Sequence, residues 1–537
     1  MAMKVIGFNL GHNASLAVLD DGKLVEYLEE ERLSRVKRAE KIDFLLDYVL
    51  DKYEDISHAV LTQAYYSHTR ERHFANIKYR FAVINRLKSQ GIVVVDYTNC
   101  HHLCHASNAY FGSGFDEAVC VVMDGKGSVV KHNNIKYSEI ESIYHCKDGK
   151  ISEVFKHYST FAGLKECKEH TAKFGNLPVF EGHKIYSDRF SIGQSFRTVS
   201  SYCGFDEPEG GKTMGLSTYG KESGSSLWEY VNGHYFATTQ LYPRNDSGWG
   251  KYYGEEVVKE DLAYNVQKCG EEAALNMVRK AVELTGCNNV VVSGGFFMNC
   301  VSNYNIVRNL DVNLYVDPTC YDGGTAIGAA MLAFKKRIQL NTLYLGPTYD
   351  LSHIEGEDVT YDDIAKLISE NNIVAMYQGR SEAGPRALGN RSILYNPCDP
   401  NGRDHVNIIK RREAFRPFAG TVLQHCADEW FDMQGLVESP FMMYAVDALP
   451  HTYDKIPAIL HVDKTCRVQT VTKKQNEHYY NLIAAFQQIT GVPILFNTSF
   501  NLAGEPLVET PEDAFRTLDN SDIQYLYFPE VGKLVRK

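Results

Sequence analysis

Long hydrophobic runs, paired cysteines and an excess of basic charge are all missing from this chain. No apolar stretch approaches the roughly 18–20 residues that a helix needs to cross a bilayer, so we expect no membrane-spanning segment. The 13 cysteines are scattered without a CxxC pair, which favours reduced thiols over a disulfide framework. The formal net charge of −11 disfavours tight, non-specific binding of nucleic acid, although a local basic cleft would escape that average.

Short-period repeats, low-complexity segments and the shape of a signal peptide are missing too, which predicts a cytoplasmic globular protein. The 537 residues, 44% of them hydrophobic, exceed what one hydrophobic core usually supports, so we expect at least two domains. The turn-rich stretch NTLYLGPTYD, after which the composition changes, sets the predicted boundary between residues 1–345 and residues 346–537.

The chain opens with β-prone segments at Met3–Leu10 and Ala14–Leu19, and a third strand follows the turn at Asp20–Gly22. This strand–turn–strand pattern is typical of actin-like ATPase domains, whose first turn faces the bound phosphates. His12 lies in that turn and either serves the reaction or caps the loop. The next stretch, EEERLSRVKR from Glu29 to Arg38, is dense in charge and predicts the solvated start of a helix.

Two histidines and an aspartate indicate a metal site. His101 and His105 are four residues apart, so on a helix they share one face and reach one ion. Asp124 follows the buried strand Val119–Met123, at the end where open α/β sheets bind ligands. A zinc knuckle with the nearby cysteines would need a second cysteine pair, and a pair of core histidines is the other alternative. The aspartate favours the metal site.

Glycines follow two later strands. Asn289–Ser293 runs into Gly294 and Gly295, which would admit a nucleotide close to the backbone, and Asn299 could bond its ribose or base. Asp322 stands before Gly323, Gly324 and a helix, where free N–H groups suit a phosphate and the carboxylate could complete a metal shell.

Lys212, in the run EPEGGKTMG, combines a lysine with flexible glycines and is a further candidate for nucleotide binding.

A basic, glycine-rich loop dominates the C-terminal part. The sequence EAGPRALGNRS, Glu382–Ser392, continues to Gly420, and between Arg380 and Arg416 there are eight Lys or Arg residues against four Asp or Glu. Glycines let the backbone approach a ligand, and arginines match phosphate or carboxylate oxygens. We interpret this loop as a socket for a small polyanion, the alternative being a solvated charged loop. A later strand, VPILF, leads into the polar cluster Asn497–Ser499.

Taken together, and in their order along the chain, the motifs of this sequence are specific enough to indicate one protein family. HHLCHA, MDGKGS, SGGFFMN, DGGTAIGAA, EAGPRALGNRS, KRREAFRPFA, RVQTV and TGVPILFNTSFN occur in that order. The chain resembles the O-carbamoyltransferase family of nodulation-factor and antibiotic-tailoring enzymes, from Gly7 to Phe515, and GPRALGNRS with NTSFN is the most telling part.

The resemblance implies an α/β protein with an N-terminal, two-lobed actin-like domain followed by a YrdC-like α/β domain. It implies that the second domain makes carbamoyl adenylate from carbamoyl phosphate and ATP with Mg²⁺, releasing phosphate and pyrophosphate. The carbamoyl group then passes in the first domain to an acceptor hydroxyl, beside a divalent metal, iron in the family.

The resemblance also assigns residues. The metal ligands would be His101, His105, Asp124 and Asp322, and the residues that grip phosphates would be Arg386, Arg391, Lys410, Arg416 and Arg467. Asn497 and Ser499 match the polar end of the following strand. His12 is our candidate for the base that accepts the proton of the acceptor hydroxyl.

Two other functions stay in view: tRNA threonylcarbamoyl transfer, and a nucleotide-switched, actin-like binding protein that performs no transfer. The sequence does not choose the acceptor among sugars, natural-product alcohols and a hydroxymethylated nucleobase in DNA, such as 5-hydroxymethylcytosine. It does not fix the metal or the oligomeric state, for which a homodimer is the common default.

Overall fold

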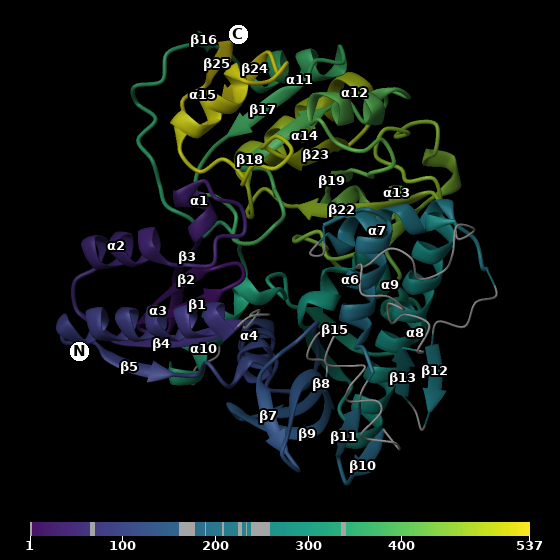
Figure 1. Ribbon diagram of the computed structural model, residues 1–537. Helices are drawn as coiled ribbons and strands as arrows, with labels where there is room; N and C mark the ends of the chain where they lie inside the picture. The colour runs from purple at the N-terminus through teal and green to yellow at the C-terminus, as the bar shows by residue number, and fades with distance from the viewer. Residues whose placement is uncertain are drawn as a thin grey trace. The chain divides into compact units, whose positions relative to one another are not determined.

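The computed structural model describes residues 3–64, 70–160, 178–187, 189–206, 209–223, 228–231, 234–237, 258–334 and 340–537. The chain forms two compact units (Figure 1). The first comprises Met1–Glu30 and Arg38–Leu340, and the second comprises Glu31–Lys37 and Asn341–Lys537. A short segment near the start of the chain therefore belongs to the second unit, which a single boundary near residue 345 does not anticipate.

The first sheet of the first unit contains β1 (Lys4–Gly11), β2 (Ser15–Asp20), β3 (Lys23–Glu29), β4 (Ile56–Ala64) and β5 (Val93–Asp96). Its strand order is β3-β2-β1-β4-β5. The first three strands form an antiparallel meander, whereas β4 runs parallel to β1 and β5 parallel to β4. The strand–turn–strand opening expected from the sequence is thus confirmed.

The second sheet of this unit has the order β10-β11-β9-β8-β6-β14-β15, with β7 paired to β8. Its strands are β6 (Glu117–Met123), β7 (Val129–His132), β8 (Ile135–Lys147), β9 (Lys150–Ser159), β10 (Val179–Glu181), β11 (Lys184–Ser187), β14 (Asn289–Ser293) and β15 (Asn313–Val316). β14 lies parallel to both β6 and β15. Its apolar run is buried, as expected of a central parallel strand. A separate hairpin pairs β12 (Trp228–Val231) with β13 (His234–Ala237).

Two helices of the first unit, α4 (His101–Ser113) and α10 (Thr325–Phe334), link its sheets. The unit also contains the helices α2 (Asp43–Lys52), α3 (Arg70–Ser89), α6 (Ile192–Tyr202), α7 (Gly210–Leu216), α8 (Lys259–Thr285) and α9 (Cys300–Asn309). α10 packs on β1, β2 and β4, α4 packs on β6 and β14, and the two helices pack on each other. α8 buries an apolar face that includes Leu262 and Val266 near its start.

The second unit is built on one mixed sheet of order β16-β25-β24-β17-β18-β23-β19-β22-β21-β20. Its strands are β16 (Glu357–Asp358), β17 (Val374–Tyr377), β18 (Arg391–Tyr395), β19 (Ala419–Leu423), β20 (Phe431–Asp432), β21 (Ala445–Ala448), β22 (Thr465–Val471), β23 (Ile494–Ser499), β24 (Tyr525–Phe528) and β25 (Lys533–Arg536). The polar cluster Asn497–Ser499 lies inside β23, and not beyond its end, because Ser499 still pairs with Ser392 of β18.

The helices of this unit are α11 (Tyr361–Ser369), α12 (Gly402–Ile409), α13 (Ala427–Trp430), α14 (Glu477–Thr490) and α15 (Pro511–Asp519). α11 and α15 each begin with a capping box, formed by Thr360 with Asp363 and by Thr510 with Asp513. The α/β class predicted from the sequence is confirmed in both units. Among the described residues, no helix combines the length and apolar character that spanning a bilayer requires.

Candidate functional site

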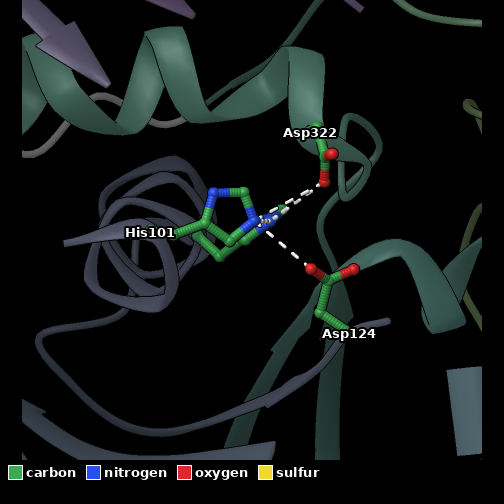
Figure 2. A group of neighbouring side chains, drawn as sticks. His101, Asp124 and Asp322 are labelled. Atoms are coloured by element: carbon green, nitrogen blue, oxygen red, sulfur yellow. Dashed lines mark hydrogen bonds and ion pairs between the residues drawn. The ribbon is translucent and has the colours of Figure 1, made fainter. Parts of the chain in front are cut away.

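Four side chains converge in the first unit. His101 and His105 lie one turn apart at the start of α4, Asp124 follows β6, and Asp322 opens the short 3-10 helix η4 (Asp322–Gly324) before α10. One ligand atom from each lies within 4.8 Å of the others, and all four residues are buried. We call these residues the His–Asp cluster. Figure 2 shows both carboxylates turned toward the imidazole nitrogens.

The distances inside the His–Asp cluster suit a bound cation. His101 Nε2 lies 3.3 Å from Asp124 Oδ2, 3.2 Å from His105 Nε2 and 3.6 Å from Asp322 Oδ1 (Figure 2). Two imidazole nitrogens and two carboxylates thus share one water-poor space. Nitrogen and oxygen donors of this kind are those that bind divalent transition metals. The residues present therefore fit the metal that the sequence predicts.

The electrostatics of the cluster lead to the same conclusion. Burial opposes a charge on His101, but the hydrogen bonds and charges of Asp124 and Asp322 outweigh burial and raise its pKa to about 10. Burial likewise opposes the ionised form of Asp322, yet His101 and His105 hold the pKa of that carboxyl below its usual value. Two buried carboxylates thus require positive charge between them, which a proton on His101 or a divalent ion supplies.

A second layer of residues fixes the cluster from behind. Ser293, at the end of β14, places its Oγ 3.2 Å from His105 Nδ1 and donates to Asp317 Oδ2 at 2.8 Å. Asn108 Nδ2 donates to the same Asp317 oxygen at 2.8 Å. Hydrogen bonds on the far nitrogen of a ligating histidine set its tautomer and orientation. Asp317 therefore holds His105 through Ser293.

The glycines singled out from the sequence lie beside the His–Asp cluster and help to position its carboxylates. Gly294 has φ 98°, and a Cβ there would lie 2.2 Å from the Met123 carbonyl oxygen, so only glycine lets β14 pass the end of β6. The Gly295 N–H donates to Asp124 Oδ1 at 3.1 Å. The Gly323 carbonyl accepts from Ser15 Oγ at 2.7 Å. These contacts position Asp124 and Asp322, and contact of the glycines with a nucleotide stays a prediction.

His12 lies near the cluster, in the turn between β1 and β2. Asn9 Nδ2 donates to the His12 carbonyl at 2.9 Å and so shapes that turn. Burial lowers the pKa of His12, and the charge of Asp322 partly offsets this. The ring is therefore biased toward its neutral form, the form that accepts a proton.

Asn299 and Lys212 have other partners. Asn299 caps α9, where its Oδ1 accepts from the Ser302 N–H at 3.1 Å and its Nδ2 donates to Gln267 Oε1 at 2.8 Å. Lys212 Nζ pairs with Glu209 Oε2 at 2.7 Å. Nucleotide binding by either side chain stays a prediction, and it would require these contacts to be exchanged.

In the second unit, residues 379–391 form the loop that carries Arg386, which we call the glycine loop. Glu382 Oε1 accepts from the main-chain N–H groups of Leu388, Asn390 and Arg391, at 2.7, 2.8 and 3.2 Å. Ser381 to Gly384 are buried and Arg386 is half-buried. The loop is thus internally organised, which favours the predicted socket over a solvated loop.

Four further cations of this unit interact electrostatically with one another, and we call them the cation cluster: Lys410, Arg412, Arg416 and Arg467. Burial lowers the pKa of Lys410 well below its ordinary value, and the charges of Arg412 and Arg416 lower it further. The same two causes, burial and then the charges of Arg416 and Arg467, lower the pKa of Arg412. Burial and neighbouring positive charge both disfavour these cations, and an anion bound beside them would offset that cost.

Strand register places Arg467 and Asn497 on one face of the sheet, because both pair with Ala419 from opposite sides. Within the part of the chain that the structure describes, Arg467 Nε and Asn497 Oδ1 are buried without a hydrogen-bond partner. Buried polar atoms are rarely left unsatisfied in proteins. A polar ligand would satisfy both. Ser499 instead donates to Asn501 at 2.6 Å, and its main-chain carbonyl accepts from Lys410 Nζ.

Arg391 differs from the other predicted phosphate-binding residues. Its side chain is fully buried and lies 3.6 Å from the centre of the Tyr377 ring. Its guanidinium donates to the carbonyls of Gln378 at 2.5 Å and Gly379 at 3.1 Å. With these donors engaged by main-chain oxygens, Arg391 holds the end of the glycine loop.

Three residues of these sites were not singled out from the sequence. Arg412 belongs to the quoted motif KRREAFRPFA, so charge density alone would have found it. Asp317 directly follows β15, the same strand-end signal that identified Asp124. Glu382 opens the quoted motif EAGPRALGNRS, but residue type does not reveal its role, which is to accept main-chain N–H groups of its own loop.

A mixed α/β chain with a buried His–Asp cluster in one unit and a cation cluster in the other has the parts of a group-transfer enzyme. Comparison with known families identifies the transferred group as carbamoyl. The carbamoyltransferase N-terminus family matches residues 52–331, and the carbamoyltransferase C-terminus family matches residues 365–535. The chain belongs to the carbamoyltransferase family and is an enzyme of that class. This excludes a binding protein that performs no transfer.

Curated relatives and solved structures were compared as well. The chain is 28% identical to nodulation protein NolNO of Sinorhizobium fredii, over 96% of this chain and 78% of that protein. It is 30% identical to an uncharacterized protein of Methanocaldococcus jannaschii, over 81% of this chain and 73% of that protein. Among solved structures, full-length HypF in its phosphate- and nucleotide-bound form matches with a TM-score of 0.38 and 14% identity, over 62% of this chain and 55% of that chain.

Proposed function

We propose that this carbamoyltransferase is an ATP-dependent O-carbamoyltransferase that works through carbamoyl adenylate. The observation that carries the proposal is the cation cluster of the second unit, where Lys410 and Arg412 are buried among like charges. ATP and carbamoyl phosphate together bring the several negative charges that such a cluster would balance. Membership of the carbamoyltransferase family identifies carbamoyl as the group that is transferred.

In the first half-reaction, water cleaves carbamoyl phosphate to carbamate and phosphate. A carbamate oxygen then attacks the α-phosphorus of ATP, and the bond to pyrophosphate breaks. Arg386, Lys410, Arg416 and Arg467 are assigned to neutralise the phosphoryl oxygens and hold the reactants in line. Asn497 and Ser499, on β23 beside Lys410, are assigned to orient the planar carbamate.

In the second half-reaction, an acceptor hydroxyl attacks the carbonyl carbon of carbamoyl adenylate, and the bond to the AMP oxygen breaks. His12 is assigned to take the hydroxyl proton on its neutral ring. His101, His105, Asp124 and Asp322 would hold the divalent metal, for which iron is our expectation, and this metal would supply Lewis-acid polarisation of the anhydride. Gly294, Gly295 and Gly323 keep the backbone around these ligands compact.

The acceptor is an alcohol of a sugar or natural product, or a hydroxymethylated nucleobase. Purified protein, ATP, Mg²⁺ and carbamoyl phosphate should be incubated with representatives of each class, and with tRNA and threonine as the competing reaction. Mass spectrometry should show the carbamoyl increment on one class of alcohol. Modification of tRNA alone would replace this proposal by threonylcarbamoyl transfer.

The adenylation step has its own test, the release of pyrophosphate from ATP and carbamoyl phosphate without acceptor. Arg386→Ala should abolish release. Arg411→Ala is the matched control, because Arg411 is exposed and donates to the Asn520 carbonyl at 3.1 Å. It should leave release unchanged. A wild-type protein that releases no pyrophosphate would contradict the adenylate mechanism.

A further inference from the structure

The charged stretch Glu29–Arg38 is only partly in solvent: Glu29, Glu30 and Arg32 are buried, whereas Val36 and Lys37 are exposed. Its first part stays with the first unit, where Glu30 is 2% exposed and accepts from the N–H groups of Phe44 at 3.1 Å and Leu45 at 2.9 Å, at the start of α2. Residues 31–37 fold with the second unit. The short helix α1 (Glu30–Ser34) carries the chain into it (Figure 1). Buried charges need specific partners, and the partners of this segment indicate its role in the second unit.

Arg32 contacts the glycine loop directly. Its Nη2 donates to the Gly384 carbonyl at 3.0 Å and the Glu382 carbonyl at 3.4 Å. Its Nη1 lies 3.7 Å from Glu509 Oε2, with both side chains almost fully buried. The two carbonyls lie just before Arg386 in sequence. Arg32 therefore fixes the main chain from which the Arg386 side chain projects.

Glu509 ties the same network to both ends of the loop. Its Oε1 accepts from Ser381 Oγ at 2.9 Å, at the start of the loop. Its main-chain oxygen accepts from Arg391 Nη2 at 3.3 Å, at the end of the loop. Arg391 and Arg32 supply the positive charges that act on the buried Glu509 carboxylate. The loop is thus held at its start, middle and end by one buried network.

Neighbouring residues of the segment bind elsewhere. Arg35 donates to the Leu507 carbonyl at 2.7 Å and the Pro506 carbonyl at 3.1 Å, and it lies 3.4 Å from Asp513 Oδ2. Lys37 Nζ donates to the Glu505 carbonyl at 3.1 Å. These contacts attach the segment to residues 505–507 and Asp513, and none of them is to a residue of the glycine loop itself. Asp513 Oδ2 also accepts from the Glu509 N–H at 3.3 Å, so Arg35 reaches the loop only indirectly, and its variant tests attachment of the segment apart from the direct contacts of Arg32.

We propose that Arg32 is a positioning residue for adenylate formation: a side chain from the start of the chain fixes the glycine loop, so that Arg386 is preset for the anionic substrates. The proposal rests on the function assigned above to the second unit. Lysine cannot replace Arg32, because one ammonium lacks the planar fork that reaches two carbonyls and a carboxylate together.

The test uses the full chain with Arg32→Gln, Arg32→Lys and the matched control Arg35→Gln. Hydrogen exchange followed by mass spectrometry reports the protection of the amides in residues 382–391 without any substrate. Both Arg32 variants should exchange there about tenfold faster or more, as expected for the loss of charge-assisted hydrogen bonds. Arg35→Gln should leave this exchange unchanged, even where it lowers the melting temperature.

Kinetics give a second, independent readout. Arg32→Gln should raise the KM for carbamoyl phosphate in pyrophosphate release by about tenfold, with a smaller change in kcat. In an Arg386→Ala background, residual substrate binding should not weaken further, because Arg32 acts through Arg386. Should Arg32→Gln not fold, Glu509→Gln removes the charge opposite it and is expected to speed exchange of the same amides.

Wild-type exchange in the loop of the folded Arg32 or Glu509 variants would overturn the proposal. Equal acceleration in Arg35→Gln would also overturn it, because Arg32 would then be only an anchor of the segment. A wild-type protein that releases no pyrophosphate would defeat the proposed function, and the exchange experiment would still decide the role of Arg32.

Discussion

Ser293 connects the His–Asp cluster to the core of the first unit. It is fully buried, and its hydroxyl stands between His105 Nδ1 and the Asp317 carboxylate. The arrangement leaves His105 Nε2 directed toward His101 and Asp322. The ligand geometry of this site therefore depends on a residue that would not itself touch a metal.

Replacing Ser293 by alanine should weaken metal binding by about 10–100-fold, because His105 loses the partner that sets its tautomer. Titration of the metal-free protein with Fe²⁺ or Co²⁺ measures this. Ser142→Ala is the control, since the Ser142 hydroxyl lies 2.7 Å from Nδ1 of His102, which is outside the His–Asp cluster. Equal metal affinity in the two variants would remove Ser293 from the account.

Lys410 is a residue whose burial costs stability, although the proposed function needs its charge. Its Nζ contacts the Ser499 carbonyl, Ser499 Oγ at 3.2 Å and Asn501 Oδ1 at 3.3 Å, yet burial and neighbouring cations lower its pKa. A lysine whose pKa is lower in the folded state than in the unfolded state destabilises the fold at low and neutral pH. This cost declines as the pH rises toward 10.5, the ordinary value.

Lys410→Met should therefore stabilise the ligand-free protein by about 0.5–2 kcal/mol at pH 7 while abolishing pyrophosphate release. The gain should shrink as the pH rises toward 10.5, because the wild-type cost falls over the same range. Chemical unfolding at a series of pH values measures it. A destabilised variant at neutral pH would show that the hydrogen bonds of Lys410 outweigh its burial.

At the level of elements, the His–Asp cluster depends on the close passage of β6 and β14. Gly294 allows this passage, since a side chain there would meet the Met123 backbone. The next residue, Gly295, donates its N–H to Asp124. The spacing of two strands and the position of one ligand are thus set by adjacent glycines.

Gly294→Ala should cost more than the roughly 1–2 kcal/mol of a left-handed alanine, because it adds a clash to the strain. Gly286→Ala is the matched control: Gly286 also has a positive φ, 68°, but a Cβ there meets nothing within 4 Å. Thermal unfolding should separate the two variants. Equal melting temperatures would mean that the strands move apart without cost.

Elements whose apolar runs end in a polar residue could be predicted from the sequence, because hydrophobic periodicity marks the strand and its end marks the site. Asp124 after β6 was singled out in this way, and Asp322 was singled out because it stands before two glycines and a helix. The segment of residues 31–37 could not be, because its charges resemble a solvated face and the partners of Arg32 lie about 350 residues away. Residue type also did not show that carbonyls engage the Arg391 guanidinium.

At the scale of the whole molecule, the proposed function divides the chemistry between two units. The cation cluster and glycine loop belong to the second unit, and the His–Asp cluster and His12 belong to the first. An activated carbamoyl group would therefore be made in one unit and consumed in the other. Variants of the two units should fail at different steps.

The most direct measurement follows isotopically labelled carbamoyl phosphate in a single turnover with ATP and His105→Ala. Because the proposed function assigns the His–Asp cluster to transfer alone, this variant should release pyrophosphate at the wild-type rate and accumulate labelled carbamoyl adenylate, with no carbamoylated acceptor. Arg386→Ala should form no adenylate. A His105→Ala protein that makes no carbamoyl adenylate, although it is folded and binds ATP, would contradict the division of the reaction between the two units.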